Sequence, residues 1–290
     1  MFSEKIEKSY TNTFKTYEII ISDDSHGENT KELIKKHFTY CKYLKGPQKG
    51  PSANRNNGVK IANGSWIIFI DDDCYVNHDF LQSYYKLMQT FESNVYEGKI
   101  ICPDKHNNPF YRQPENTQGG CLPSGNFLIS KEYFNKIGQF DEEMIIMEDM
   151  EFALRIKRNG DSILFCEDAI AFHPSQKKPA TFYWDWIFHF KWQLLLRYKS
   201  GLKSINKSLI FSLFDTVYSH IEFILRLTVH LLTKHDQERY LMYWFERFLA
   251  WTTMPITLLH LIYWDYIYRT KIKNMEIKIG PFPKNANPNH

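Results

Sequence analysis

The sequence lacks several features that would point to particular classes of protein. Its five cysteines are scattered and form no C-x-x-C pair, which favours a reduced, cytosolic compartment over a disulfide framework. The formal net charge is only +3, so charge gives no reason to expect a nucleic acid as partner. The first residues include the acidic Glu4 and no apolar segment, so we expect no signal peptide.

Long uncharged apolar runs are scarce as well. Residues 248–264 contain no Asp, Glu, Lys or Arg, but the run includes Pro255 and is slightly shorter than the ~20 residues of a membrane span. Aromatic residues, in contrast, make up 16% of the chain and are dense in residues 182–198, among Lys191 and Arg197. Such a mixture of aromatic and basic residues is typical of a helix at a membrane interface.

The composition changes near residue 180, where we expect a domain boundary. The first 73 residues alternate between helix-like and strand-like patterns, which predicts an α/β domain with parallel strand pairing over residues 1–180. Two hypotheses stay open for residues 181–275: a helical region packed on the first domain, or a region attached to a membrane surface. Residues 276–290 are expected to form a polar tail.

Three carboxylates follow the most apolar strand of the predicted sheet. The strand, residues 66–70, reads Trp-Ile-Ile-Phe-Ile, which predicts a parallel strand buried on both faces. Asp71, Asp72 and Asp73 come directly after it. Three adjacent like charges repel one another unless a cation or ligand offsets them. A divalent metal between Asp71 and Asp73 is one interpretation, and a solvated acidic turn is the other. A calcium loop of the EF-hand type is excluded because the required Gly and closing Glu are absent.

Acidic residues occur at two further positions of interest. Asp23 and Asp24 follow the strand-like residues 17–22, and Glu148 and Asp149 open a helix that runs to about residue 159. Carboxyl ends of parallel strands are where open α/β sheets bind ligands. The acids of the helix have a purely local alternative, because carboxylates are favoured in a first helical turn.

These motifs resemble family 2 glycosyltransferases of the GT-A fold, over roughly residues 1–175. Four blocks carry the resemblance in the family's order: residues 19–25 (IIISDDS), 51–58 (PSANRNNG), 67–73 (IIFIDDD) and 147–155 (MEDMEFALR). Each motif alone is weak, but four in order at plausible spacings are specific. The implied fold is a Rossmann-like mixed sheet flanked by helices, followed here by an aromatic-rich helical C-terminal region.

The resemblance also implies how the donor is held. Asp24, with Asp23, would accept a hydrogen bond from a uracil ring, and Arg55 would reach the diphosphate. Mg²⁺ or Mn²⁺ would offset the diphosphate charge, since oxygen ligands suit these ions. The implied metal ligands are Asp71, Asp73 and His173. Asp72, Asn126 and Glu148 are further candidates for the donor site.

Asp149 matches the family's catalytic base, which would deprotonate the acceptor hydroxyl as it attacks the anomeric carbon with inversion. Alternatives remain for several of these side chains. Arg55 also fits a solvated helix charge, His173 a structural position before Pro174, and Asn126 an ordinary turn residue.

The implied function is metal-dependent transfer of a sugar from a nucleotide-sugar, with a UDP-sugar as the expected donor, to a cell-surface glycan or a lipid-linked acceptor. The implied location is the cytoplasm, at the inner face of the cell membrane, with the membrane surface but no nucleic acid as a partner. The alternative is a catalytically inactive nucleotide-sugar-binding or scaffold protein at the membrane.

The chain departs from the family pattern at its start. The family opens with an apolar strand and a P-x-Y-N-type turn, whereas Met1 already lies within what resembles the following helix. Three explanations stay open: a start site assigned too far downstream, a shortened protein in which another segment such as residues 275–279 takes the strand's place, or a degenerate copy.

Overall fold

We describe a computed structural model of the chain. It describes residues 17–106, 108, 110–179, 182–200 and 254–274, with single positions between 221 and 252. Contacts divide the chain into two units. The first comprises residues 1–104 and 113–174, and the second residues 105–112 and 175–290. The predicted helix over residues 1–16 and the tail over 276–290 lie outside the described residues, and the predicted boundary near residue 180 stays a prediction.

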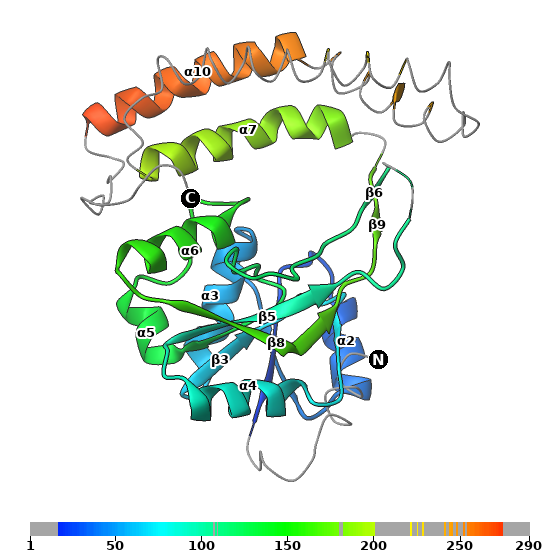
Figure 1. Ribbon diagram of the computed structural model, residues 1–290, viewed down its shortest axis with the longest axis vertical. Coiled ribbons are helices and arrows are strands. Elements are labelled where there is room, and N and C mark those ends of the chain that lie inside the picture. The colour runs from blue at the N-terminus through cyan, green and yellow to red at the C-terminus, as the bar shows by residue number, and fades with distance from the viewer. Residues whose placement is uncertain are drawn as a thin grey trace. The chain divides into compact units, whose positions relative to one another are not determined.

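The first unit alternates strands and helices along most of its length (Figure 1). Its strands are β1 (Ile19–Asp23), β2 (Cys41–Lys45), β3 (Trp66–Phe69), β4 (Tyr75–Val76), β5 (Val95–Ile101), β7 (Phe127–Ser130) and β8 (Ile163–Phe172). Its helices are α2 (Asn29–His37), α3 (Pro51–Ile61), α4 (Phe80–Thr90), α5 (Lys131–Lys136) and α6 (Glu148–Arg158). Most of these elements match the sequence pattern within a few residues.

The strands form a mixed five-stranded sheet and a separate two-stranded one. The larger sheet has the order β3-β7-β5-β8-β4, with β5 and β8 parallel and β7 antiparallel to both β3 and β5. The strands β1 and β2 pair in parallel. The expectation that β3 is a parallel strand buried on both faces was therefore wrong in detail: its described ladder is antiparallel, and only Phe69 of β3 is fully buried.

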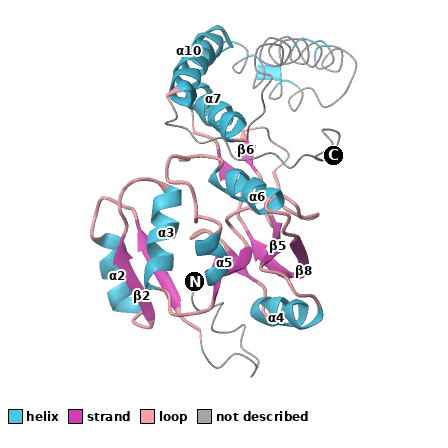
Figure 2. Ribbon diagram, turned by 90° about the vertical axis from the view of Figure 1, so that its left-hand side faces the viewer, coloured by secondary structure: helices cyan, strands magenta, loops and turns pink. Residues whose placement is uncertain are grey.

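Side chains alternate between two apolar cores on the two faces of the larger sheet. Phe127 and Ile129 of β7 face one core, which contains residues of α3, α5 and α6, whereas Leu128 faces the other, which contains residues of α4. Figure 2 shows α4 apart from α3, α5 and α6 accordingly. The first core is rich in phenylalanine: Phe69, Phe134, Phe140 and Phe152 pack with ring centroids 4.9–5.6 Å apart.

Among its described residues, the second unit contains two long helices and a short ladder. The ladder pairs β6 (Tyr111–Arg112) with β9 (Gln176–Lys177) in antiparallel fashion. The helices are α7 (Phe182–Lys199) and α10 (Met254–Lys273), which pack against each other. Within the described part of the chain, neither these helices nor any other combines the length and apolar character needed to cross a bilayer.

Candidate active site

The acidic trio follows the carboxyl end of β3, and His173 follows that of β8. The carboxylate of Asp71, the thiol of Cys74 and the imidazole of His173 offer ligand atoms that all lie within 4.8 Å of one another. Nδ1 of His173 lies 2.9 Å from the carbonyl oxygen of Pro174, and Nε2 lies 3.4 Å from Oδ1 of Asp73. If Nδ1 donates its proton to Pro174, the lone pair of Nε2 faces a carboxylate oxygen, which is an arrangement that a cation stabilises.

The three predicted metal ligands are thus brought together, although their binding of a metal stays a prediction. Cys74 is an additional candidate that the sequence analysis missed. Burial, with the nearby charges of Asp71 and Asp73, raises the pKa of the Cys74 thiol to about 12. Without a cation beside it, this side chain stays a neutral thiol at physiological pH.

Arg55 of α3 connects the trio with the start of α6. Its guanidinium donates to Oδ1 of Asp71 at 3.1 Å and to Oε1 of Glu148 at 2.7 Å, and it lies 5.7 Å from the ring centre of Phe140. The alternative of a solvated helix charge is therefore wrong, because the Arg55 side chain is only 21% exposed and paired with two carboxylates.

Glu148 and Asp149 form the first turn of α6, after Met147 in left-handed backbone conformation (φ 65°). Burial raises the pKa of Glu148, and Asp149 adds to this effect, while Arg55 partly offsets it. Burial also raises the pKa of Asp149 despite backbone N–H groups of Met150 and Ser124 and the charge of Arg55. A carboxylate whose pKa is raised accepts a proton more readily, as a general base must.

The loop before β7 lies against both acidic groups. A Cβ atom added to Gly125 would lie 2.8 Å from Oδ2 of Asp71, so this backbone approaches the carboxylate as closely as only glycine permits. The backbone of the preceding Ser124 interacts with Asp149. Together with Arg55, the loop joins β3 and α6 into one site.

The anchor of this loop is Glu97 of β5, which the sequence analysis missed. Glu97 is fully buried, and its carboxylate accepts hydrogen bonds from the backbone N–H groups of Gly120, Cys121 and Leu122 and from the Asn116 side chain. A single acid inside an apolar strand gives little signal in a sequence, because its partners lie 19–25 residues away.

Asp23 and Asp24 lie at the carboxyl end of β1. Asp23 is buried and accepts from Tyr43 Oη at 2.9 Å and from the Ser25 backbone at 3.0 Å. Burial opposes its charged form, but these hydrogen bonds and Lys45 lower the pKa of Asp23 overall. Asp24 accepts from the backbone N–H groups of Gln48 and Gly50, at 2.7 and 3.2 Å. In this structure Asp24 therefore holds the loop that leads into α3.

Asn126 occupies the core and not the surface of the site. It is 0% exposed, accepts from Tyr84 Oη at 2.7 Å, and donates to the carbonyl oxygens of Lys99 and Ala169 at 2.9 Å. It thereby connects α4, β5 and β8. We give Asn126 no part in donor binding, because every polar atom of its side chain is used within the core.

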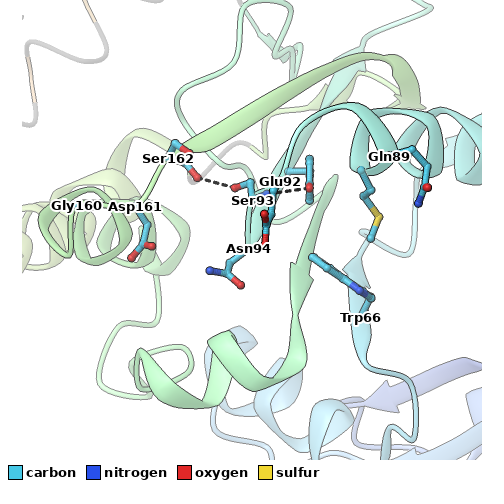
Figure 3. A pocket seen from close by; sticks show the side chains of 10 residues that line it. Trp66, Gln89, Glu92, Ser93, Asn94, Gly160, Asp161 and Ser162 are labelled. Atoms are coloured by element: carbon cyan, nitrogen blue, oxygen red, sulfur yellow. Dashed lines mark hydrogen bonds between the residues drawn. The ribbon is translucent and has the colours of Figure 1, made fainter.

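A hollow of about 420 Å³ lies at the opposite end of the sheet (Figure 3). It is lined by residues at the amino ends of β3, β5 and β8, with Trp66 on one side and Asn94 on the other. The acidic trio and His173 follow the carboxyl ends of β3 and β8, so this hollow is separate from the candidate active site.

The sequence of the chain matches the model of a known family. The profile of glycosyl transferase family 2 matches residues 4–153, about half of the chain. The chain belongs to glycosyl transferase family 2. This match includes the acids after β1 and β3, Arg55 and the Glu148–Asp149 pair. The prediction of a glycosyltransferase is confirmed at the level of the family.

Curated relatives are similar over parts of their length. A GalNAc(5)-diNAcBac-PP-undecaprenol β-1,3-glucosyltransferase of Campylobacter jejuni is 40% identical over 76 residues, which cover 24% of this chain and 25% of that protein. The glycosyltransferase AglE of Haloferax volcanii is 20% identical over 174 residues, or 55% of this chain and 57% of AglE. The chain matches less than two thirds of either relative's length.

Among solved structures, Staphylococcus aureus TarS is similar with a TM-score of 0.50 and 16% sequence identity, over 85% of this chain and 51% of TarS. At this identity the likeness concerns the fold alone. Together with the family match, it confirms the predicted GT-A fold.

Proposed function

We propose that this protein transfers a sugar from a nucleotide-sugar, UDP-linked in the simplest case, to a hydroxyl group of a cell-surface glycan or lipid-linked acceptor, with inversion. The observation that carries the proposal is the convergence of three acidic groups through one helix. Arg55 of α3 contacts both Asp71 and Glu148, and Asn54 of the same helix bonds to Ser22, next to Asp23.

The ligand atoms around Asp71, Asp72 and Asp73 suit a divalent cation such as Mg²⁺ or Mn²⁺. Carboxylates of Asp71 and Asp73 and the imidazole of His173 are suitable ligands, and a cation there would neutralise a departing diphosphate. The chain's own residues supply the rest. In this proposal Asp23 and Asp24 would orient the base, Asp72 would contribute to the donor site, and Asp149 would accept the proton of the attacking hydroxyl.

We infer the class of acceptor from the name of one relative and from the composition of one segment of the chain. The Campylobacter jejuni relative is named for an undecaprenol-linked substrate, and the aromatic and basic composition of residues 182–199 suits a lipid surface. A place at the inner face of the cell membrane follows from this proposal, since nucleotide-sugars are cytoplasmic donors.

The test is turnover of UDP-sugars with Mn²⁺ or Mg²⁺ by the full chain. Asp149→Asn should lower the rate by about 10²–10⁴-fold, the usual contribution of a general base, and Asp73→Ala should abolish the metal response. Asp168→Asn changes an exposed acid of β8 and serves as the control. A full rate in Asp149→Asn would refute the assignment of the base. UDP binding by calorimetry without any turnover would instead support the inactive binding or scaffold protein.

A further inference from the structure

Helix α10 is apolar on two faces; among the described residues, one face is buried against α7 and the other is exposed. Thr257, Leu261 and Tyr268 are buried on the face that packs against α7. Tyr198 of α7 donates to Oδ1 of Asp265 at 2.6 Å, and its ring lies 6.0 Å from that of Tyr268. These contacts fix the orientation of α10 about its axis.

The other face carries five large apolar side chains that are 45–69% exposed: Ile256, Leu259, Ile262, Tyr263 and Tyr266. At 3.6 residues per turn, they fall within an arc of about 120° on the helix surface. Contiguous apolar patches of this kind on a soluble protein mark interaction sites. We call these five residues the α10 stripe.

The chemistry of the stripe changes in one direction along the helix. Its first three residues are aliphatic, and the next two are tyrosines. Arg269 and Lys273 continue the same face toward the C-terminal end, and both are exposed. Nε of Arg269 donates to Oδ2 of Asp265 at 2.7 Å, so the anionic contact depends mainly on Lys273. Lys271, also exposed, projects from a different side of the helix. From Ile256 to Lys273 this gradient extends over about 26 Å.

This order matches the layers of a lipid surface. Aliphatic side chains favour the acyl region, tyrosine the headgroup boundary, and cations the lipid phosphates. A second copy of the chain fits less well. Two stripes paired antiparallel about a two-fold axis would set the cations of one copy against the aliphatic residues of the other.

We propose that the α10 stripe docks obliquely on an anionic lipid surface, with Ile256, Leu259 and Ile262 inserted among the acyl chains and Arg269 and Lys273 at the phosphates. This inference rests on the proposed function. It specifies which residues would contact the membrane that carries a lipid-linked acceptor. It also adds a contact on α10 to the one that the composition of residues 182–199 favours; in that segment Leu194, Leu195 and Tyr198 are buried.

The experiment is flotation of the full chain with vesicles of phosphatidylcholine and phosphatidylglycerol, compared with vesicles of phosphatidylcholine alone. The variant L259Q/I262Q/Y266Q removes the stripe while keeping good helix formers at exposed positions. It should need at least about tenfold more lipid for half-maximal binding. The single variant L259Q provides a milder change should the triple variant fold poorly. Leu33→Gln and Phe91→Gln, which alter apolar residues of similar exposure in the first unit, should bind like the wild type.

A pair of charge variants tests the direction of docking. Lys273→Glu should weaken binding to anionic vesicles more than Lys271→Glu, because only Lys273 lies on the stripe's face. Three outcomes would each overturn the inference. L259Q/I262Q/Y266Q could bind vesicles as well as the wild type, or the two lysine variants could have equal effects. A stripe variant could also only convert a dimer to a monomer. Turnover of UDP-sugar with a water-soluble acceptor is measured in parallel. If the wild-type chain shows no turnover but still floats with anionic vesicles, the result would count against the proposed transferase activity and would leave lipid docking supported.

Discussion

Arg55 offers the sharpest test of how the candidate site is held together. The substitution Arg55→Met keeps an unbranched apolar stem near Phe140 but removes the charge shared by Asp71 and Glu148. Removing one partner of a buried ion pair costs about 3–5 kcal/mol. The side chains of Arg55, Asp71 and Glu148 are 21%, 30% and 10% exposed, so solvent reduces the cost. We expect the free energy of unfolding to fall by about 2–3 kcal/mol near neutral pH.

The loss of stability in Arg55→Met should depend on pH, and the direction of this dependence follows from the pKa of Glu148. Burial raises the pKa of Glu148, so the folded state binds this proton more tightly than the unfolded chain, and stability falls as pH rises between the two pKa values. Arg55 offsets part of that rise, so its removal increases the pKa of Glu148 further. The difference between Arg55→Met and wild type should therefore grow with pH.

Urea unfolding at about pH 5 and about pH 8 measures this difference, with equal m-values as the check on two-state behaviour. Arg55→Lys is the matched control, because it keeps a charge but not the planar fork, and it should lose less stability. A loss that is the same at both pH values, or a loss below about 0.5 kcal/mol, would show that the bridge between Asp71 and Glu148 does not support the fold.

Three further predictions concern separate parts of the site. Glu97→Gln turns an acceptor oxygen into a donor amide facing backbone N–H groups, and should cost about 3 kcal/mol in urea unfolding, whereas Glu92→Gln on the surface should cost little. Gly46→Ala would place a Cβ atom in collision with Oδ1 of Asp24, and should lower the melting temperature and weaken UDP binding in calorimetry. Cd²⁺, which prefers sulfur ligands, should inhibit Mn²⁺-supported turnover, and Cys74→Ser should relieve the inhibition by about tenfold or more; equal sensitivity of both proteins would exclude Cys74 as a ligand.

The sequence was informative where local patterns decide structure. Apolar strands followed by carboxylates predicted β1, β3 and the acids after them, and the acids of α6 matched a recognisable block. In each case the signal comes from neighbouring residues along the chain.

Long-range partners were not predictable in the same way. Arg55 and Glu148 are 93 residues apart, and Asn56 bonds to Phe140 over 84 residues. The antiparallel insertion of β7 between β3 and β5 also leaves no local trace, because an apolar tetrapeptide fits either direction. Asn126 was a candidate for the donor site, with an ordinary turn residue as the alternative, because its sequence context gives no sign of the buried partners that occupy its amide.

The arrangement of α3 has a consequence for how the first unit opens. Within the described residues, β1 pairs only with β2 and β3 only with β7. Side chains of α3 bond to both groups of strands: Asn54 and Asn57 to Ser22, and Arg55 to Asp71. No described ladder joins the two sheets, so the unit should divide into two cooperative parts in amide hydrogen exchange. Amides of β5 and β8 should exchange only with global unfolding, whereas those of β1 and β2 should exchange through a smaller opening in which α3 acts as the hinge.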